Sequence, residues 1–182
     1  MSKGPDRPVS VSLNASNPVR MLVEGINRFN FDAWIQAGQE GMMEVKKILN
    51  PVDGSDHSVH STRYAIELAR LFKAQVILLH CHAKFPIVMA EPYFQQAIND
   101  ISKESETLVE PFQEMLDTSG VDYDIRILEG VPGDKIPEVA KIEKVDLIVM
   151  GSRGVTDLTG LILGSVAHQV LHRTDCPVFI SK

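Results

Sequence analysis

The chain has 182 residues, which is enough for one domain with a complete hydrophobic core. Lys and Arg number 18 against 24 Asp and Glu, and the net charge of −6 opposes nucleic-acid binding, which needs a basic face. No apolar run reaches the roughly 18 residues of a membrane span, and the first residues lack the apolar segment of a signal peptide. These features predict a cytoplasmic protein that neither spans a membrane nor binds nucleic acid.

The first 43 residues are predicted to form an N-terminal extension, separate from a domain at 44–182. The extension opens with a stretch rich in Ser, Pro and Asn, which we interpret as an irregular arm. Apolar residues then recur at mostly helical spacing over Val19–Trp34, after an Asn17–Pro18 pair that suits a helix start. A helix with the only Trp is expected to dock on its own domain or a neighbouring chain; the alternative is a segment without order.

Beyond residue 44, predicted strands and helices alternate, because short apolar runs bounded by Gly or Pro are separated by segments with helical spacing. The predicted strands are Ile48–Val52, Gln75–His82, Asp122–Leu128 at a sheet edge, Val145–Met150 and Pro177–Ser181. The predicted helices follow Ser55, run from about Tyr93 to Thr118, and cover Ile136–Glu143 and Gly164–Arg173. Pro111 is expected to bend or divide the longest helix.

This alternation predicts the α/β class, with a single doubly wound five-stranded parallel sheet and helices on both faces. In such sheets ligands bind at the carboxyl ends of the strands, where the direction of winding reverses. The site is therefore expected at that end of the sheet.

The most informative motif follows the fourth predicted strand. Gly151 and Gly154 are separated by two residues, and nine more residues lead to Gly164 and Ser165 at the start of a helix. Glycines let backbone N–H groups approach an anion, and a helix N-terminus adds unpaired donors and a favourable dipole. The motif therefore indicates a phosphate-binding loop.

This spacing resembles the nucleotide-binding signature of the universal stress protein family. The segment Ile48–Ser55 resembles the first strand and acidic turn of that family, and the likeness extends over Val45–Lys182. It implies the strand order 3-2-1-4-5, with the reversal between the strands that end at Asp53 and at Gly151. Retention of the three glycines and Ser165 implies the nucleotide-binding branch of the family.

The sugar and base of a nucleotide are assigned to the first two strands. Asp53 is expected to accept hydrogen bonds from a ribose hydroxyl; the alternative is a turn or N-cap aspartate before Gly54. Pro51 and Val52 are expected to line the adenine pocket. By resemblance, Cys81 occupies the adenine-contacting position of the second strand.

The phosphates are assigned to the glycine motif. Ser152 and Ser165 are candidate hydroxyl donors, although Ser165 has capping of its helix as an alternative role. Arg153 is placed to reach a β- or γ-phosphate, with a solvated surface arginine as the alternative. The predicted binding set is Pro51, Val52, Asp53, Cys81, Gly151, Ser152, Arg153, Gly154, Gly164, Ser165 and Val166.

Other catalytic and metal motifs are missing or weak. The sequence has neither the GxxxxGK[ST] of P-loop NTPases nor a GxGxxG after the first strand. His57 and His60 favour adenylyl transfer only weakly. In the run His80–His82 the central Cys81 points away from both histidines, so we predict no metal site there. Cys81 and Cys176 are expected to be buried free thiols, and no residue is assigned a catalytic role.

Together these features predict a protein of stress response or regulation that binds ATP, ADP or AMP, with or without Mg²⁺, and catalyses little or nothing. The alternatives are a ligand-free interaction module of the same fold and a slow ATPase or adenylyl-transferring enzyme. The last strand is apolar and expected at an exposed sheet edge, which invites pairing. By resemblance, we expect a homodimer through Pro177–Ser181.

Overall fold

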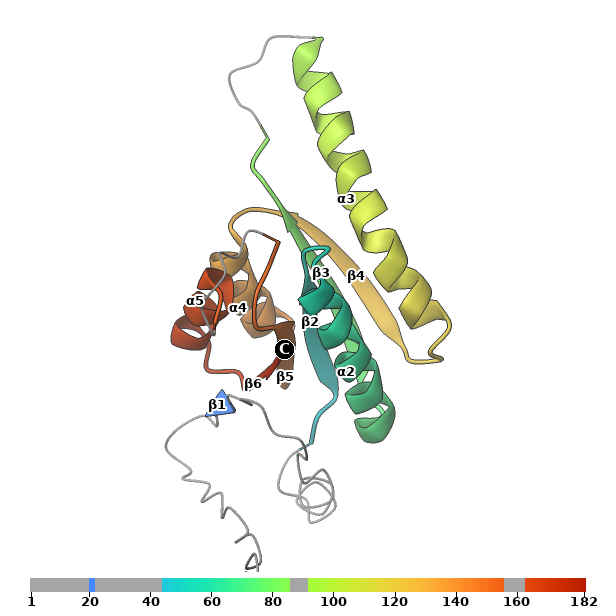
Figure 1. Ribbon diagram of the computed structural model, residues 1–182, viewed down its shortest axis with the longest axis vertical. Helices are drawn as coiled ribbons and strands as arrows, with labels where there is room; N and C mark the ends of the chain where they lie inside the picture. Colours follow the sequence, from blue (N-terminus) through green and yellow to red (C-terminus); the bar gives the residue numbers. More distant parts are fainter. Residues whose placement is uncertain (1–19, 22–43, 86–91, 156–162) are drawn as a thin grey trace, which may run out of the picture.

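The computed structural model describes residues 20–21, 44–85, 92–155 and 163–182. Strands and helices alternate along the chain (Figure 1). They are β1 (Arg20–Met21), β2 (Lys47–Val52), α2 (Asp56–Phe72), β3 (Gln75–His82), α3 (Tyr93–Asp117), β4 (Tyr123–Glu129), α4 (Pro132–Ile142), β5 (Leu147–Gly151), α5 (Ser165–Arg173) and β6 (Val178–Ser181).

The strands form one parallel sheet in the order β1-β6-β5-β2-β3-β4. The five strands β2 to β6 are the five predicted from the sequence, and their order is the predicted 3-2-1-4-5. Winding reverses between β2 and β5, which pair through Ile48 with Leu147 and Leu49 with Ile148.

The two-residue strand β1 was not predicted. It pairs with β6 in parallel, Arg20 opposite Val178 and Met21 opposite Phe179. The expectation that the last strand is the exposed edge is therefore wrong, and so is the predicted helix at residues 20–21. The open edge of β6 offers unpaired backbone N–H and C=O groups to an extended segment. Hydrogen bonding to this edge decides the structure of residues 20–21, although the spacing of apolar residues around them favours a helix. The rest of the extension, including Trp34, lies outside the described residues.

The helix and strand limits agree with the sequence in most places. β3 has the predicted limits, and β4 is an edge strand as predicted. α3 continues through Pro111 as one helix, which is tolerated because this exposed position leaves the freed carbonyl group accessible to water. α4 begins four positions before the predicted Ile136, with Pro132 in its first turn, where proline is favoured.

Helices cover both faces of the sheet. α2 and α3 lie on one face and α4 and α5 on the other (Figure 1). Alternate strand residues supply the two cores, so that Ile48 packs under α2 and α3 and Leu49 under α4 and α5. Met150, on the same side as Leu49, is 5% exposed and belongs to the core.

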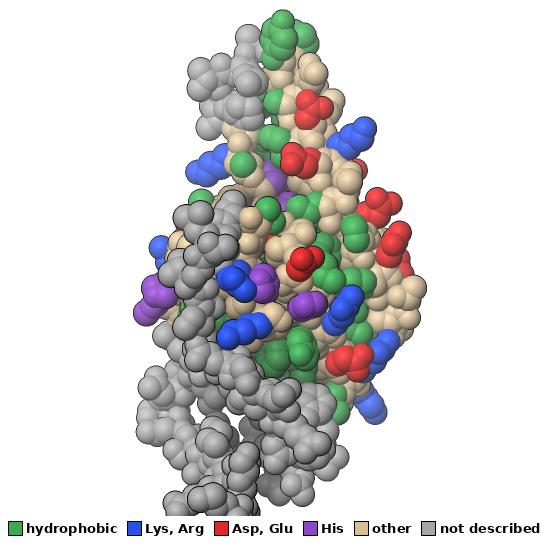
Figure 2. Space-filling model, in the orientation of Figure 1, with side chains coloured by type: hydrophobic (Ala, Val, Ile, Leu, Met, Phe, Trp, Pro, Cys, Tyr) green, Lys and Arg blue, Asp and Glu red, His purple; other side chains and the backbone are tan. Residues whose placement is uncertain are grey.

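The surface of α3 is acidic. Red patches follow α3 in Figure 2 from the upper part of the view to its right edge, and the helix carries several exposed carboxylates. They are Asp100, Glu104, Glu106, Glu110, Glu114 and Asp117. No helix in the described ranges combines the length and the apolar composition that a membrane span requires.

The strands β2 and β5 separate before they end. Their register stops at Leu49 opposite Ile148, although the strands continue to Val52 and Gly151. Just beyond that point the buried Asn50 side chain donates from Nδ2 to the Val149 carbonyl at 2.9 Å. Its Oδ1 accepts from the Thr62 hydroxyl at 2.7 Å, which ties α2 to the same place. A side-chain bridge thus holds the two strands where the backbone ladder stops.

Replacing Asn50 with Ala is expected to lower the free energy of unfolding by about 2–4 kcal/mol, because buried polar groups lose their partner. Urea denaturation followed by circular dichroism measures the change. Asn99→Ala is the matched control, since Asn99 is an exposed α3 residue whose Oδ1 accepts from Gln95. Equal losses in both variants would show that the buried bridge contributes nothing.

Candidate functional site

The turn after β2 places a carboxylate at the point where β2 and β5 separate. Gly54 has a φ of 83°, and Ser55 caps α2 by accepting from the Ser58 N–H at 3.2 Å. Asp53 Oδ1 accepts from the Ser55 N–H at 3.1 Å and from its hydroxyl at 2.6 Å. The turn alternative considered for Asp53 is therefore present in the structure.

Asp53 also joins this turn to the glycine loop. Its Oδ2 accepts from the Val155 N–H at 3.1 Å. A carboxylate has about four acceptor positions, and three are used here, so one remains for a ligand hydroxyl. The hydrogen bonds from Ser55 and Val155 to Asp53 are compatible with the predicted ribose contact, which stays a prediction.

The three glycines of the motif lie where neighbouring atoms would crowd a side chain. A Cβ on Gly151 would approach His57 Cβ to 2.8 Å, and one on Gly154 would overlap Asp53 Oδ2. A Cβ on Gly164 would lie 3.2 Å from the backbone of the loop itself. Close packing therefore explains all three glycines, and it draws the loop against α2, Asp53 and α5.

The helix α5 begins next to this loop, because its N-cap residue Gly164 packs against the loop backbone. Gly164 is its N-cap, with no side-chain hydrogen bond, and the Gly164 N–H donates to the Ser152 carbonyl at 2.7 Å. Ser165 is exposed and is the first helical residue, so the capping alternative for its hydroxyl is wrong. The N–H groups of the first turn, Val166 included, have no acceptor within the helix, and they suit an anion.

The two residues between Gly151 and Gly154 differ in burial. Arg153 is half-buried in the loop. Ser152 is 2% exposed, and among the described residues its hydroxyl has no hydrogen-bond partner. Its backbone holds the loop, because the Ser152 N–H donates to the Ser181 carbonyl at 2.7 Å. A phosphate contact by the Ser152 hydroxyl remains a prediction and needs this buried group to become accessible.

Apolar side chains occupy the α4–α5 side of the same sheet end. Cys81 is paired in register with Leu128, and both pack against the core together with Val166. Strand alternation places Pro51 on this side as well, whereas the Val52 side chain is buried in the opposite core. The Val52 side chain therefore lies on the wrong face for the predicted adenine pocket, and only the Val52 backbone is left for that predicted contact.

Both cysteines are free, as predicted, but each is only partly buried. Burial raises the pKa of the Cys81 thiol to about 11, partly offset by the charge of Lys135. Burial, followed by the charge of Asp146, raises the pKa of Cys176 to about 12. At neutral pH both thiols are protonated, so Cys81 presents a weakly polar, uncharged surface.

The two histidines of α2, His57 and His60, have different surroundings. His57 packs against Gly151, and within the described structure its buried Nδ1 has no hydrogen-bond partner. His60 Nδ1 lies 3.3 Å from the Lys182 carbonyl oxygen. Each histidine thus contacts a different strand end.

The histidines of β3 behave as the alternation predicts. His80 is buried, and its Nδ1 donates to the Val52 carbonyl at 3.1 Å, while Cys81 packs on the opposite face. Across the described ranges, no three His, Cys, Asp or Glu side chains are grouped around a possible ion.

Comparison with known proteins identifies the family. The model of the universal stress protein family matches residues 44–182. The chain belongs to the universal stress protein family. Universal stress protein MJ0531 of Methanocaldococcus jannaschii is 37% identical over 139 residues, which cover 75% of this chain and 82% of that relative.

Solved structures show the universal stress protein fold. The structure of hypothetical protein MJ0577 has a TM-score of 0.69 and 31% identity, covering 77% of this chain and 97% of that one. A universal stress protein in complex with cAMP has a TM-score of 0.62 and 23% identity, covering 76% and 98%. The α/β fold and the family predicted from the sequence are both confirmed.

Two contributors to the site were missed by the sequence interpretation. Asn50 bridges β2 and β5, and the Val155 N–H holds Asp53. An Asn within an apolar strand was a visible signal for the first. Every residue type except proline has a backbone N–H, so the hydrogen bond from Val155 to Asp53 could not be predicted from the sequence.

Replacing Gly154 with Ala is expected to destabilise the protein by about 1–3 kcal/mol, because the new Cβ displaces Asp53. Thermal and urea unfolding of Gly154→Ala, Asp53→Ala and the double variant form a cycle that isolates this contact. The Gly154→Ala penalty should fall below about 1 kcal/mol when Asp53 is Ala. Strict additivity would contradict the assigned contact.

Proposed function

We propose that this protein binds an adenine nucleotide, ATP, ADP or AMP, at the end of the sheet where β2 and β5 separate. One observation carries the proposal: Asp53, the glycine loop and the N-terminus of α5 are joined by direct hydrogen bonds at that place. A carboxylate beside unpaired helix N–H groups matches a sugar linked to phosphates.

The phosphates lie on the first turn of α5, where N–H groups and the helix dipole favour an anion. Arg153, in the loop that packs on Gly164, adds the positive charge that a second or third phosphate needs. The ribose hydroxyl donates to the acceptor position that remains on Asp53. Mg²⁺, when present, is held by phosphate oxygens and water.

The base lies against Pro51, the Val52 backbone and Cys81. A neutral thiol and a proline ring provide an uncharged surface for a flat aromatic group, and backbone N–H and C=O groups provide orientation. The cAMP complex of a protein with the same fold supports an adenine nucleotide as the class of ligand.

We infer a binding protein of stress response or regulation rather than an efficient enzyme, since His57 and His60 contact different strand ends. Slow ATP hydrolysis and a ligand-free interaction module are the competing functions. Phosphate release that is lost in His60→Ala would favour the first, and no nucleotide binding at millimolar concentration would favour the second.

Isothermal titration calorimetry of the full chain with ATP and with AMP tests the proposal. Arg153→Gln should weaken ATP binding by about tenfold and AMP binding much less, because only ATP has phosphates beyond the first. Arg70→Gln is the matched control, since Arg70 binds Glu67 and the Ser119 carbonyl at the far end of α2.

Arg70→Gln should bind both nucleotides as the parent protein does. Equal losses of ATP and AMP affinity in Arg153→Gln would contradict the assigned phosphate contact. No heat with either nucleotide in the parent protein would reject the function itself.

We also propose that the protein forms a homodimer through β6, with β1 as a competitor for the same edge. β1 pairs with Val178 and Phe179, so a second chain reaches this part of β6 only when β1 leaves. Two paired residues form a short strand, which a longer intermolecular pairing can replace.

Removing residues 1–43 leaves the segment that matches the family model and should strengthen dimerisation by about tenfold. Sedimentation equilibrium of the full and shortened chains measures the two dissociation constants. A shortened chain that is monomeric, or that dimerises no better than the full chain, would reject the competition.

A further inference from the structure

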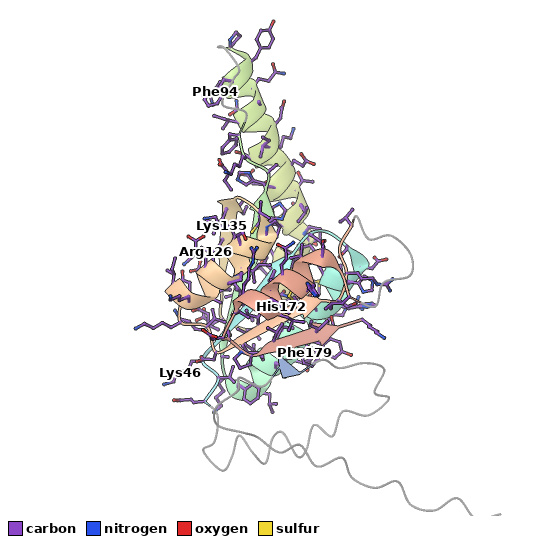
Figure 3. All side chains as sticks on the ribbon, turned by 90° about the vertical axis from the view of Figure 1, so that its left-hand side faces the viewer. Lys46, Phe94, Arg126, Lys135, His172 and Phe179 are labelled. Carbon is purple, nitrogen blue, oxygen red and sulfur yellow. The ribbon has the colours of Figure 1, made fainter. Side chains whose placement is uncertain are left out.

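Two histidines stand one turn apart on the exposed side of α5. His168 and His172 are both exposed, and their Nε2 atoms lie 3.3 Å apart. Their ring centroids are 4.5 Å apart at an interplanar angle of 59°. Figure 3 looks onto α4 and α5 and labels His172 on this helix. The pair has no part in the proposed nucleotide site.

The distance between the two nitrogens matches that of two ligands on one ion. In the absence of an ion, the same separation suits an N–H···N hydrogen bond between the two rings. Two imidazole nitrogens that each lie about 2.0–2.1 Å from a tetrahedral ion are about 3.3–3.4 Å apart. Histidines at i and i+4 project from one helix face and chelate metal ions in this way in other helices.

The helix that carries the pair is well anchored. Ala167 and Val170 are 2% and 0% exposed in the core, and Arg173 forms an ion pair with Asp134 of α4. Because the backbone is fixed by these contacts, binding an ion costs only the side-chain rotamers of two histidines. The site is therefore arranged before the ion arrives.

We propose that His168 and His172 bind one divalent transition-metal ion, such as Zn²⁺, Ni²⁺ or Cu²⁺. Imidazole nitrogen suits these ions, whereas Mg²⁺ and Ca²⁺ require oxygen ligands. No third His, Cys, Asp or Glu joins the pair in the described parts of the chain, so water completes the coordination. Among the three ions, Cu²⁺ should bind most tightly.

The test is a calorimetric titration of the metal-stripped full chain with Zn²⁺ in a non-coordinating buffer. We expect one ion per chain at this site, and His168→Gln and His172→Gln should each weaken its binding by about tenfold or more, because one imidazole cannot chelate. His60→Gln is the control, since it removes an exposed histidine from α2 and should leave this binding unchanged.

Electron paramagnetic resonance of the Cu²⁺-loaded protein gives a second readout, with hyperfine coupling to two imidazole nitrogens that falls to one in either variant. Circular dichroism verifies that the variants fold. No Zn²⁺ binding at millimolar concentration, or equal Zn²⁺ affinity in the parent protein and in both His variants, would overturn the proposal and leave a hydrogen-bonded pair.

Discussion

The separation of β2 from β5 is the constraint on which the rest of this structure depends. Two parallel strands that stayed paired to their ends would leave no space at the reversal of winding. Here the register stops at Leu49 and Ile148, and the Asn50 side chain takes over the connection by binding the Val149 carbonyl. This bridge costs little because Thr62 satisfies the other end of the amide. The strand ends are thereby free to carry Asp53 on one side and the glycine loop on the other.

The glycine loop is positioned by contacts rather than by unusual backbone angles. The positive φ values among the described glycines belong to Gly54, Gly120 and Gly130, not to the three glycines of the motif. Those three are small because α2, Asp53 and the loop backbone approach them closely. A Cβ on Gly151 would crowd α2, one on Gly154 would crowd Asp53, and one on Gly164 would crowd the loop backbone. Loop position and site geometry are therefore one property of the packing.

The sequence predicted most of the fold because each strand and helix has its own periodic signal. β3 has the predicted limits, since a continuous apolar run with sharp boundaries is hard to misread. β1 was missed because its pairing depends on an open edge of β6, which no local pattern encodes. The residue types of the candidate site were chosen from motif spacing, and their contacts with a nucleotide stay a prediction. The reason for the glycines and the hydrogen bond from Val155 to Asp53 required coordinates, because both arise between distant segments.

A crystal structure of the full chain with bound ATP tests the central claim most directly. The account predicts adenine against Pro51 and Cys81, the ribose at Asp53 and the phosphates at the start of α5. It also predicts that the hydrogen bond from the Val155 N–H to Asp53 persists beside the sugar. An empty space between the ends of β2 and β5, with ATP bound elsewhere on the protein, would contradict it.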